Sequence, residues 1–375
     1  MIEDILGILL LAAMAYYLWF LWTVWRGLKR SVSPGSNDVL TVSIIVAARN
    51  EEQNIKTCLD GLASQDYDPA RFEIIIVDDH SNDRTPALAS EYSRDHSRVR
   101  IKVISCESPD RAHGKPAAIA CGIEAAEGEV VLCTDADCIT PRGWLRSMAG
   151  CFAPDVAFVA GPVAERADGK FLPQLQRLEF LGLITSAAGL IGSEAAIICN
   201  GANIAYRKTA FRQVQGYGQM TSSCDDETLM QRITARRVGR VVFNSDPRAT
   251  VLTETPSTFR DFARQRTRWA AKRGRYDNPL VLVRLIALFA FFVCVLTAAL
   301  ASLMLPDLRV LVLAVLVLKA SAELVVLRAG ARLFGIRFRL SYFLIAEILH
   351  VLYIVIAAST AQIISMRWKG RVLEQ

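Results

Sequence analysis

The stretch EVVLCTDADCIT, from Glu129 to Thr140, indicates how the central part of the chain folds. Its run from Val130 to Thr134 predicts a buried β-strand, because it is rich in residues that favour strands. Asp135 and Asp137 follow at once, and ligands of open α/β sheets bind beyond the carboxyl ends of strands. Two such carboxylates repel one another, and Mg²⁺ or Mn²⁺ would relieve that repulsion and bridge to phosphates. Taken alone, the two acids fit a solvated loop equally well.

Strand and helix patterns alternate on both sides of this stretch. Apolar runs that predict strands cover residues 41–47, 72–77, 99–104 and 156–160. Helical patterns cover residues 86–96 and 117–126, and acids in 49–52 suit the start of another helix. This alternation predicts an α/β fold with a mostly parallel sheet and helices on both faces. The sequence contains neither a P-loop nor a Gly-x-Gly-x-x-Gly motif, so a nucleotide would have to be held by other means.

Apolar residues make up 52% of the 375 residues, and they are clustered. The uncharged run 5–25 is long enough to cross a bilayer, and three more apolar runs follow between 280 and about 365. We therefore expect an N-terminal transmembrane helix within 1–30, a central domain in 31–278 and a membrane region of about three helices in 279–375. The run 171–192 is more polar at its start, and it fits either a helix in the membrane interface or one that covers the sheet.

The net charge is +6, and basic residues gather at the predicted membrane boundaries: Arg26, Lys29, Arg30, Lys272, Arg273 and Arg275. The positive-inside rule then places the central domain in the cytoplasm. A fourth crossing would leave Arg367, Lys369 and Arg371 outside, so either the short tail overrides the rule or one apolar segment lies in the interface. No basic motif interleaved with aromatics favours nucleic acid, and attraction to anionic lipid is the simpler interpretation. Nine scattered cysteines without a Cys-x-x-Cys pair argue against a disulfide framework or a zinc site.

Seven motifs follow one another along the central domain: RNEE (49–52), VDDHSNDRT (77–85), HGKPAAI (113–119), TDAD (134–137), NGANIAYRK (200–208), DDETLMQRI (225–233) and QRTRW (265–269). This ordered set resembles the family 2 glycosyltransferases, which are inverting enzymes of the GT-A fold. The Gln-x-x-Arg-Trp signature is similar to that of the membrane-bound branch, which includes cellulose, chitin and hyaluronan synthases and ceramide glucosyltransferase. The resemblance covers about residues 41–269.

On the donor side, the resemblance implies that a nucleotide-diphosphate sugar, a UDP-sugar first of all, occupies the site. It assigns Ala47 and Asp79 to the nucleobase, and Lys115 to the nucleotide as a point cation. It assigns Asp135 and Asp137 to a divalent metal, Mg²⁺ or Mn²⁺, on the diphosphate.

On the acceptor side, the resemblance implies that Asp226 is the general base. Asp225 stands beside it where the family usually has Glu. Gln265, Arg268 and Trp269 would close the site, with Arg268 on the diphosphate and Trp269 near the acceptor.

The chemistry of glycosyl transfer agrees with these roles. A metal and Arg268 would neutralise the charge that develops on the departing diphosphate. The acceptor hydroxyl is a poor nucleophile, so a carboxylate must take its proton during attack. By themselves, residues 225–227 also fit an acidic helix start. Residues 259–269, with Arg264, Arg266 and Arg268, likewise fit an amphipathic helix on the membrane surface.

The predicted membrane segments bear on the acceptor. Lys319, Glu323, Glu347 and His350 are ionisable groups within them, which suggests a function, although Lys319 and Glu323 stand four apart and would pair. Three spans after the domain are few for a polysaccharide channel. We therefore favour transfer of a single hexose to a membrane lipid alcohol over processive polymer synthesis. The alternative from another class is a non-catalytic membrane scaffold or transporter.

Overall fold

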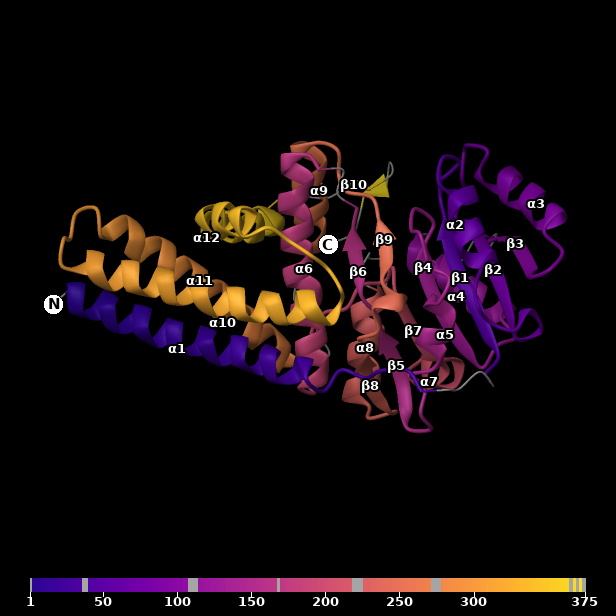
Figure 1. Ribbon diagram of the computed structural model, residues 1–375, viewed down its shortest axis with the longest axis horizontal. Helices are drawn as coiled ribbons and strands as arrows, with labels where there is room; N and C mark the ends of the chain where they lie inside the picture. Colours follow the sequence, from indigo (N-terminus) through magenta and orange to yellow (C-terminus); the bar gives the residue numbers. More distant parts are fainter. Residues whose placement is uncertain are drawn as a thin grey trace.

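The computed structural model describes residues 2–35, 40–106, 114–166, 169–217, 225–270, 278–363, 367–368 and 371–372. Long helices lie at one end of the molecule and the sheet at the other, with α6 and α9 running between them (Figure 1). This arrangement separates an apolar helical part from an α/β part.

In the described residues, seven strands form one mixed sheet in the order β3-β2-β1-β4-β7-β5-β8. They are β1 (Val42–Ala48), β2 (Phe72–Asp78), β3 (Arg100–Ser105), β4 (Val130–Asp135), β5 (Val156–Ala160), β7 (Ile204–Arg207) and β8 (Arg240–Phe243). The strands β1 to β4 are mutually parallel, whereas β7 runs antiparallel to both β4 and β5. The prediction of an α/β fold with a mostly parallel sheet is confirmed.

The sheet forms the core of the domain because its strands are apolar on both faces. Ile44, Ile75 and Leu132 are completely buried in adjacent strands. The helix α4 packs on β1 and β2, and α3 packs on β3. The helices of this part are α2 (Ile55–Ala63), α3 (Thr85–Asp95), α4 (Lys115–Ala125), α5 (Trp144–Ala149), α7 (Lys208–Gln213) and α8 (Asp225–Ala235), with the short 3₁₀ turns Pro69–Arg71 and Pro247–Ala249.

The helix expected to open at residues 49–52 begins later, at Ile55. Asn50 has a φ of 52°, in the left-handed region, which a right-handed helix does not accommodate. The N–H groups of Glu51 and Glu52 donate instead to Thr85 Oγ1 (2.7 Å) and Asp83 Oδ2 (3.1 Å). Contacts with a segment 30 residues away therefore override the local preference for a helix.

A small parallel pair, β6 (Val163–Glu165) and β9 (Val251–Thr253), extends the sheet region toward α6 and α9. Ile139 and Leu252 exchange backbone hydrogen bonds of 2.8 and 3.0 Å. The segment that follows Asp137 is thereby joined to β9.

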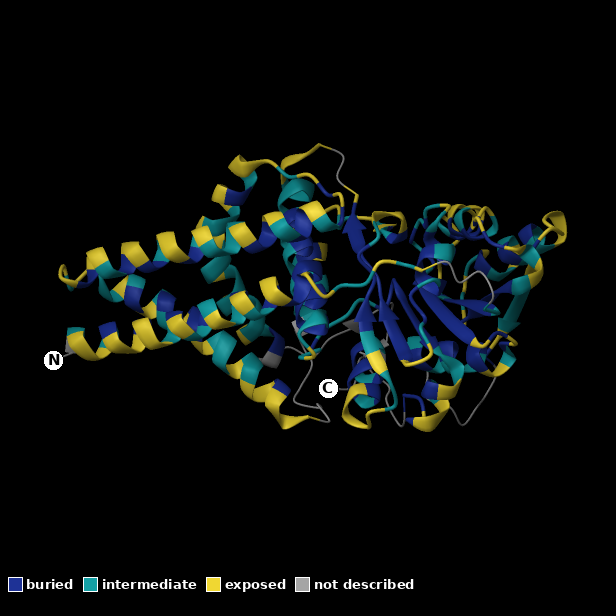
Figure 2. Ribbon diagram, turned by 60° about the horizontal axis from the view of Figure 1, so that its bottom comes forward, coloured by how far each residue is buried: buried dark blue, intermediate teal, exposed yellow. Residues whose placement is uncertain are grey.

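Within the residues that the structure describes, four helices are long and apolar enough to cross a membrane, as the sequence predicts. They are α1 (Ile2–Leu28), α10 (Pro279–Ala301), α11 (Leu308–Leu333) and α12 (Leu340–Ile363). Their outward faces are exposed (Figure 2) and carry large apolar side chains such as Ile8, Val310 and Ile348. Arg328 and Arg332 belong to α11, which continues to Leu333. The last described residues form a short antiparallel pair, β10 (Arg367–Trp368) and β11 (Arg371–Val372).

The helix α6 (Phe171–Gly192) contacts both parts of the molecule. It packs on β6 and β8 and also on α1, α11 and α12. A Cβ atom at Gly27 of α1 would lie 1.7 Å from the carbonyl oxygen of Gly189, so only glycine permits this helix crossing. The prediction of a helix that covers the sheet is thus correct for one side of α6, while its other side receives the long helices.

Candidate active site

The register of the sheet brings the ends of three strands to one edge. Ala47 of β1 lies opposite Val77 of β2 and Asp135 of β4. Just beyond β2, the N–H of Asp79 donates to the carbonyl of Ala48 (2.8 Å), and its side chain is buried. The residues that the resemblance assigns to the nucleobase and to the metal therefore belong to the same rim of the sheet.

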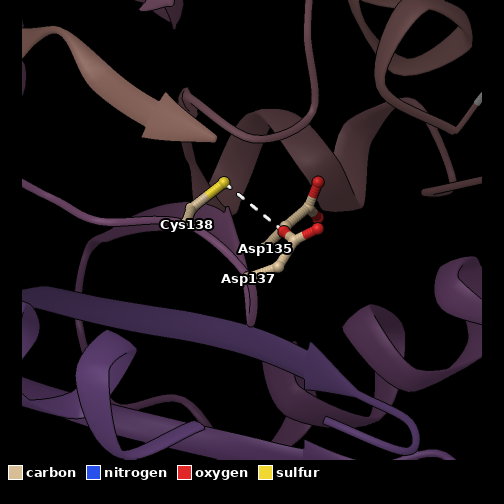
Figure 3. Close-up of side chains that lie close together, drawn as sticks. All are labelled: Asp135, Asp137 and Cys138. Carbon is tan, nitrogen blue, oxygen red and sulfur yellow. Dashed lines mark hydrogen bonds between the residues drawn. The ribbon is translucent and has the colours of Figure 1, made fainter. Parts of the chain in front are cut away.

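Asp135, Asp137 and Cys138 form a cluster at this rim (Figure 3), with potential ligand atoms within 4.8 Å of one another. Lys115, the first residue of α4, forms an ion pair with Asp135. Burial, followed by the charges of Asp135 and Glu51, raises the pKa of Asp137 to about 6. The rim thus holds more negative charge than Lys115 compensates.

The donor set of this cluster fits a hard divalent cation. Burial and the neighbouring aspartates raise the pKa of the Cys138 thiol well above its ordinary value. The thiol donates to Asp137 Oδ1 over 3.6 Å (Figure 3). Asp135 and Asp137 remain as carboxylate ligands, which suit Mg²⁺ or Mn²⁺ rather than a soft metal.

Asp226 stands in the first turn of α8 and reaches the same space from another direction. A Cβ atom at Gly201 would lie 3.1 Å from Asp226 Oδ2 and 3.2 Å from Lys115 Nζ. Both charged groups therefore face Gly201, and the absence of a side chain there leaves room beside them. Asp226 Oδ1 accepts a hydrogen bond of 2.8 Å from the N–H of Glu227. Asp225 begins α8, but its side chain lies outside the described residues, as does His113 of the HGKPAAI motif.

Gln265 and Arg268 lie on α9 (Phe259–Ala270) and line a cavity of about 290 Å³. The remaining lining residues are Glu254, Thr255, Pro256, Asp261 and Arg264. The rim carboxylates are not among the described residues that line it. The backbone connects the cavity with the rim. Glu254, which lines the cavity, follows β9 directly, and β9 pairs with the segment after Asp137.

The third residue of this signature, Trp269, lies against α6. Its ring centroid is 5.9 Å from that of Phe180, and the Arg266 guanidinium lies 4.3 Å above it. The structure therefore brings Lys115, Asp135 and Asp226 together, and it places Gln265 and Arg268 in the neighbouring cavity.

Arg266 is the site residue that sequence reasoning missed. The interpretation of Arg266 as part of a basic face on the membrane surface is wrong, because this residue is only 4% exposed. It pairs with Glu165 of β6 (3.1 Å) and Glu179 of α6 (2.6 Å). In the sequence, only the position of Arg266 within the QRTRW motif could have indicated its role. Its two partners stand far from it in the chain.

Comparison with known proteins agrees with this fold. The family model described as Glycosyl transferase family group 2 matches residues 130–356, and that described as Glycosyl transferase family 2 matches residues 43–215. The first of these covers more than half of the chain. The chain belongs to the family 2 glycosyltransferases. With its long apolar helices, it is a membrane-associated member of that family.

Individual relatives match smaller shares of the sequence of this glycosyltransferase. The chain is 27% identical over 234 residues to a poly-beta-1,6-N-acetyl-D-glucosamine synthase of Staphylococcus epidermidis, which is 61% of this chain and 53% of the relative. It is 35% identical over 112 residues to the beta-monoglucosyldiacylglycerol synthase of Synechocystis sp., which is 30% of this chain and 23% of the relative. The chain thus spans about half or less of the length of the curated relatives it matches.

A solved structure shares the arrangement over nearly the whole length. The mannosyltransferase PcManGT from Pyrobaculum calidifontis, determined in complex with GDP-Man and Mn²⁺, superimposes with a TM-score of 0.62 at 21% identity. The match covers 96% of this chain and 99% of that one. It therefore establishes a common fold for the α/β part and the long helices together.

Proposed function

We propose that this glycosyltransferase transfers a hexose from a nucleotide-diphosphate sugar, foremost a UDP-sugar, to a hydroxyl group of a membrane lipid. The observation that carries the proposal is the meeting of Asp226, Lys115 and Asp135 at the rim of the sheet, beside Gly201. A base, a cation and a metal-binding carboxylate around one space are the groups that this reaction requires.

Asp135 and Asp137 would hold the divalent metal, which supplies positive charge to the diphosphate of the donor. Lys115 adds a fixed positive charge beside Asp135, and Asp79, buried just beyond β2, would receive the nucleobase. The structure of PcManGT, which contains Mn²⁺ and GDP-Man on the same fold, supports this type of donor and cofactor.

Asp226 acts as the general base in this proposal. The acceptor oxygen attacks the anomeric carbon, its proton passes to Asp226, and the bond from that carbon to the diphosphate breaks. Attack from the side opposite the leaving group inverts the configuration, so an α-linked donor yields a β-linked product. Arg268, from the neighbouring cavity, would stabilise the leaving diphosphate.

A lipid acceptor follows from the position of the domain next to the long apolar helices. The relative that acts on diacylglycerol-type lipid, as its name states, supports this choice. Orientation with the domain in the cytoplasm is part of the proposal, because Arg26 in the last turn of α1 and Lys29 just after that helix lie over the rings of Trp22 and Trp25.

Polymer synthesis is the second candidate, because the polysaccharide synthase of Staphylococcus epidermidis matches a larger share of the chain. The two functions differ in the length of the product. A lipid carrying one sugar supports the first function, and a ladder of longer products supports the second.

The test uses the full-length protein in lipid nanodiscs with Mn²⁺, radiolabelled UDP-glucose or another nucleotide sugar, and a membrane lipid extract. We expect a β-linked glycolipid, and we expect Asp226→Asn to reduce its formation by about 10³-fold. Asp95→Asn, at an exposed position at the end of α3, is the matched control and should keep full activity. Equal turnover of Asp226→Asn and wild type would reject the base, and absence of transfer from every donor would reject the function.

A further inference from the structure

Arg266 is buried within the QRTRW signature and has contacts that differ from those of Gln265 and Arg268. Its side chain forms ion pairs with Glu165 and Glu179, and its guanidinium lies 4.8 Å above the ring of Phe262. It also donates a hydrogen bond to the Gln265 side chain. Arg266 therefore contacts a residue of the cavity on one side and two glutamates, one buried and one partly buried, on the other.

The carboxylates come from two other elements. Glu165 belongs to β6, and its side chain is 1% exposed. Glu179 belongs to α6. Removing Arg266 would leave the buried Glu165 carboxylate and the partly buried Glu179 carboxylate without their cation, which is costly in a medium of low polarity. This pairing fixes α9 against β6, which in turn pairs with β9 near the rim.

A residue of a membrane-spanning helix completes this group. The hydroxyl of Tyr353 in α12 donates to Glu179 Oε1 over 3.2 Å. Its ring also stacks on Phe262 of α9, with 5.8 Å between the centroids. The same carboxylate, that of Glu179, therefore contacts both Tyr353 of α12 and Arg266 of α9.

The orientation of α12 is itself fixed inside the membrane part. Glu347 and His350 stand three residues apart on α12, so their side chains are neighbours on the helix, and His350 stands three residues before Tyr353. Lys319 of α11 lies 2.8 Å from Glu347 Oε2 and 3.2 Å from His350 Nδ1. These polar contacts specify which face of α12 turns toward its neighbours.

We propose that Tyr353, Glu179 and Arg266 form a positioning link through which α12 holds α9, and with it Gln265 and Arg268, in the geometry needed for sugar transfer. This inference rests on the proposed function, because it assumes that the cavity on α9 takes part in transfer. Arg266 is a positioning residue here, since it acts on the site through Gln265. Glycosyl transfer thereby depends on how α12 packs in the membrane.

The decisive variant is Tyr353→Phe, which removes the hydroxyl and keeps the ring on Phe262. We expect kcat to fall about fivefold with little change in the donor KM, because alignment is lost and binding is kept. Glu179→Gln combined with Tyr353→Phe should cost little more than Glu179→Gln alone, since both act through one contact. Tyr342→Phe is the control, because Tyr342 lies on the same helix and its ring lies tilted against that of Phe171. An unchanged kcat in Tyr353→Phe would overturn the link.

Hydrogen exchange of residues 259–270 provides a readout that does not require activity. We expect faster exchange in Tyr353→Phe and unchanged exchange in Tyr342→Phe, because the hydroxyl helps to hold α9. Equal exchange in both variants would contradict the link. If wild type transfers no sugar, the proposed function fails, and the exchange experiment still decides whether α12 holds α9.

Discussion

Two groups of carboxylates in this protein differ in what neutralises them. At the rim of the sheet, Asp135 and Asp137 share their surroundings with Lys115, which pairs with Asp135. Inside the membrane part, the ammonium of Lys319 lies 2.8 Å from both Glu323 and Glu347.

The intramembrane group contains its own cation. Lys319 is 1% exposed and occupies the place between the carboxylates that a bound ion would need. His350 Nδ1 lies 3.3 Å from Glu323 Oε2, and the Tyr17 hydroxyl donates to Glu323 over 2.5 Å. This intramembrane group joins α1, α11 and α12. The predicted pairing of Lys319 with Glu323 is confirmed. At the rim, by contrast, burial and then the charges of Asp135 and Glu51 raise the pKa of Asp137, and a bound metal would favour its ionised form.

The largest expected effect separates the two groups by removing the metal. EDTA treatment should lower sugar transfer about a thousandfold, because the diphosphate then departs without its cation, and Mn²⁺ or Mg²⁺ should restore it. Asp137→Asn should raise the Mn²⁺ concentration needed for half-maximal activity. Glu347→Gln should leave that concentration unchanged. Full activity in EDTA would mean that the carboxylates at the rim, like those in the membrane part, need no metal.

The next largest effect is expected from a substitution that disrupts the intramembrane group. Lys319→Met leaves Glu323 and Glu347 buried without their cation and should destabilise the protein by about 3 kcal/mol. Thermal unfolding in detergent measures the loss. Arg332→Met, at an exposed position of the same helix, is the control. A variant that combines Lys319→Met with Gln at both glutamates should regain most of the stability, and a Lys319→Met protein as stable as wild type would show that the ammonium is dispensable.

A smaller effect concerns the contact between α1 and α11. Tyr17→Phe removes the hydroxyl that donates to Glu323 but keeps the ring, which stacks on Phe291 at 4.1 Å. The expected loss of stability is about 1.5 kcal/mol, the contribution of a hydrogen bond to a charged group. The same unfolding measurement applies, with Tyr16→Phe as comparison. A loss as large as that of Lys319→Met would mean that the hydroxyl, not the ammonium, holds the group together.

The smallest effect is a pH dependence at the rim. The pKa of Asp137 in the folded protein is about 6, above its ordinary value of 3.8, so its contribution to stability without metal is lost as the pH rises from about 4 to 6. Below pH 6 the metal must displace a proton. We therefore expect Mn²⁺ to bind about tenfold more weakly at pH 5 than at pH 7.5, and to raise the melting temperature less. Equal stabilisation at both pH values would contradict the raised pKa.

The strands and the membrane helices could be predicted from the sequence because local composition specifies them. The run predicted over 72–77 is observed as Phe72–Asp78, and all four apolar segments are helices of spanning length. The start of α2 could not be predicted in this way, because Asn50 takes a left-handed conformation and the next two N–H groups donate to Thr85 and Asp83.

The order of motifs likewise pointed to the family and to Asp135, Asp137 and Asp226 as candidates, although their roles stay predictions. Their grouping depends on the sheet register and on Gly201, which bring β4, α4 and α8 to one space. The sequence alone contains no measure of that distance.

By itself, the amino-acid sequence determined which segments are strands, which are apolar enough for a membrane, and which family the chain resembles, because each depends on neighbouring residues. Only the tertiary structure decided that Arg266 is buried, since its partners Glu165 and Glu179 stand 101 and 87 positions away in the chain. A local sequence pattern predicts that a charged side chain is exposed to solvent, because the pattern does not show which opposite charge the fold brings close to it.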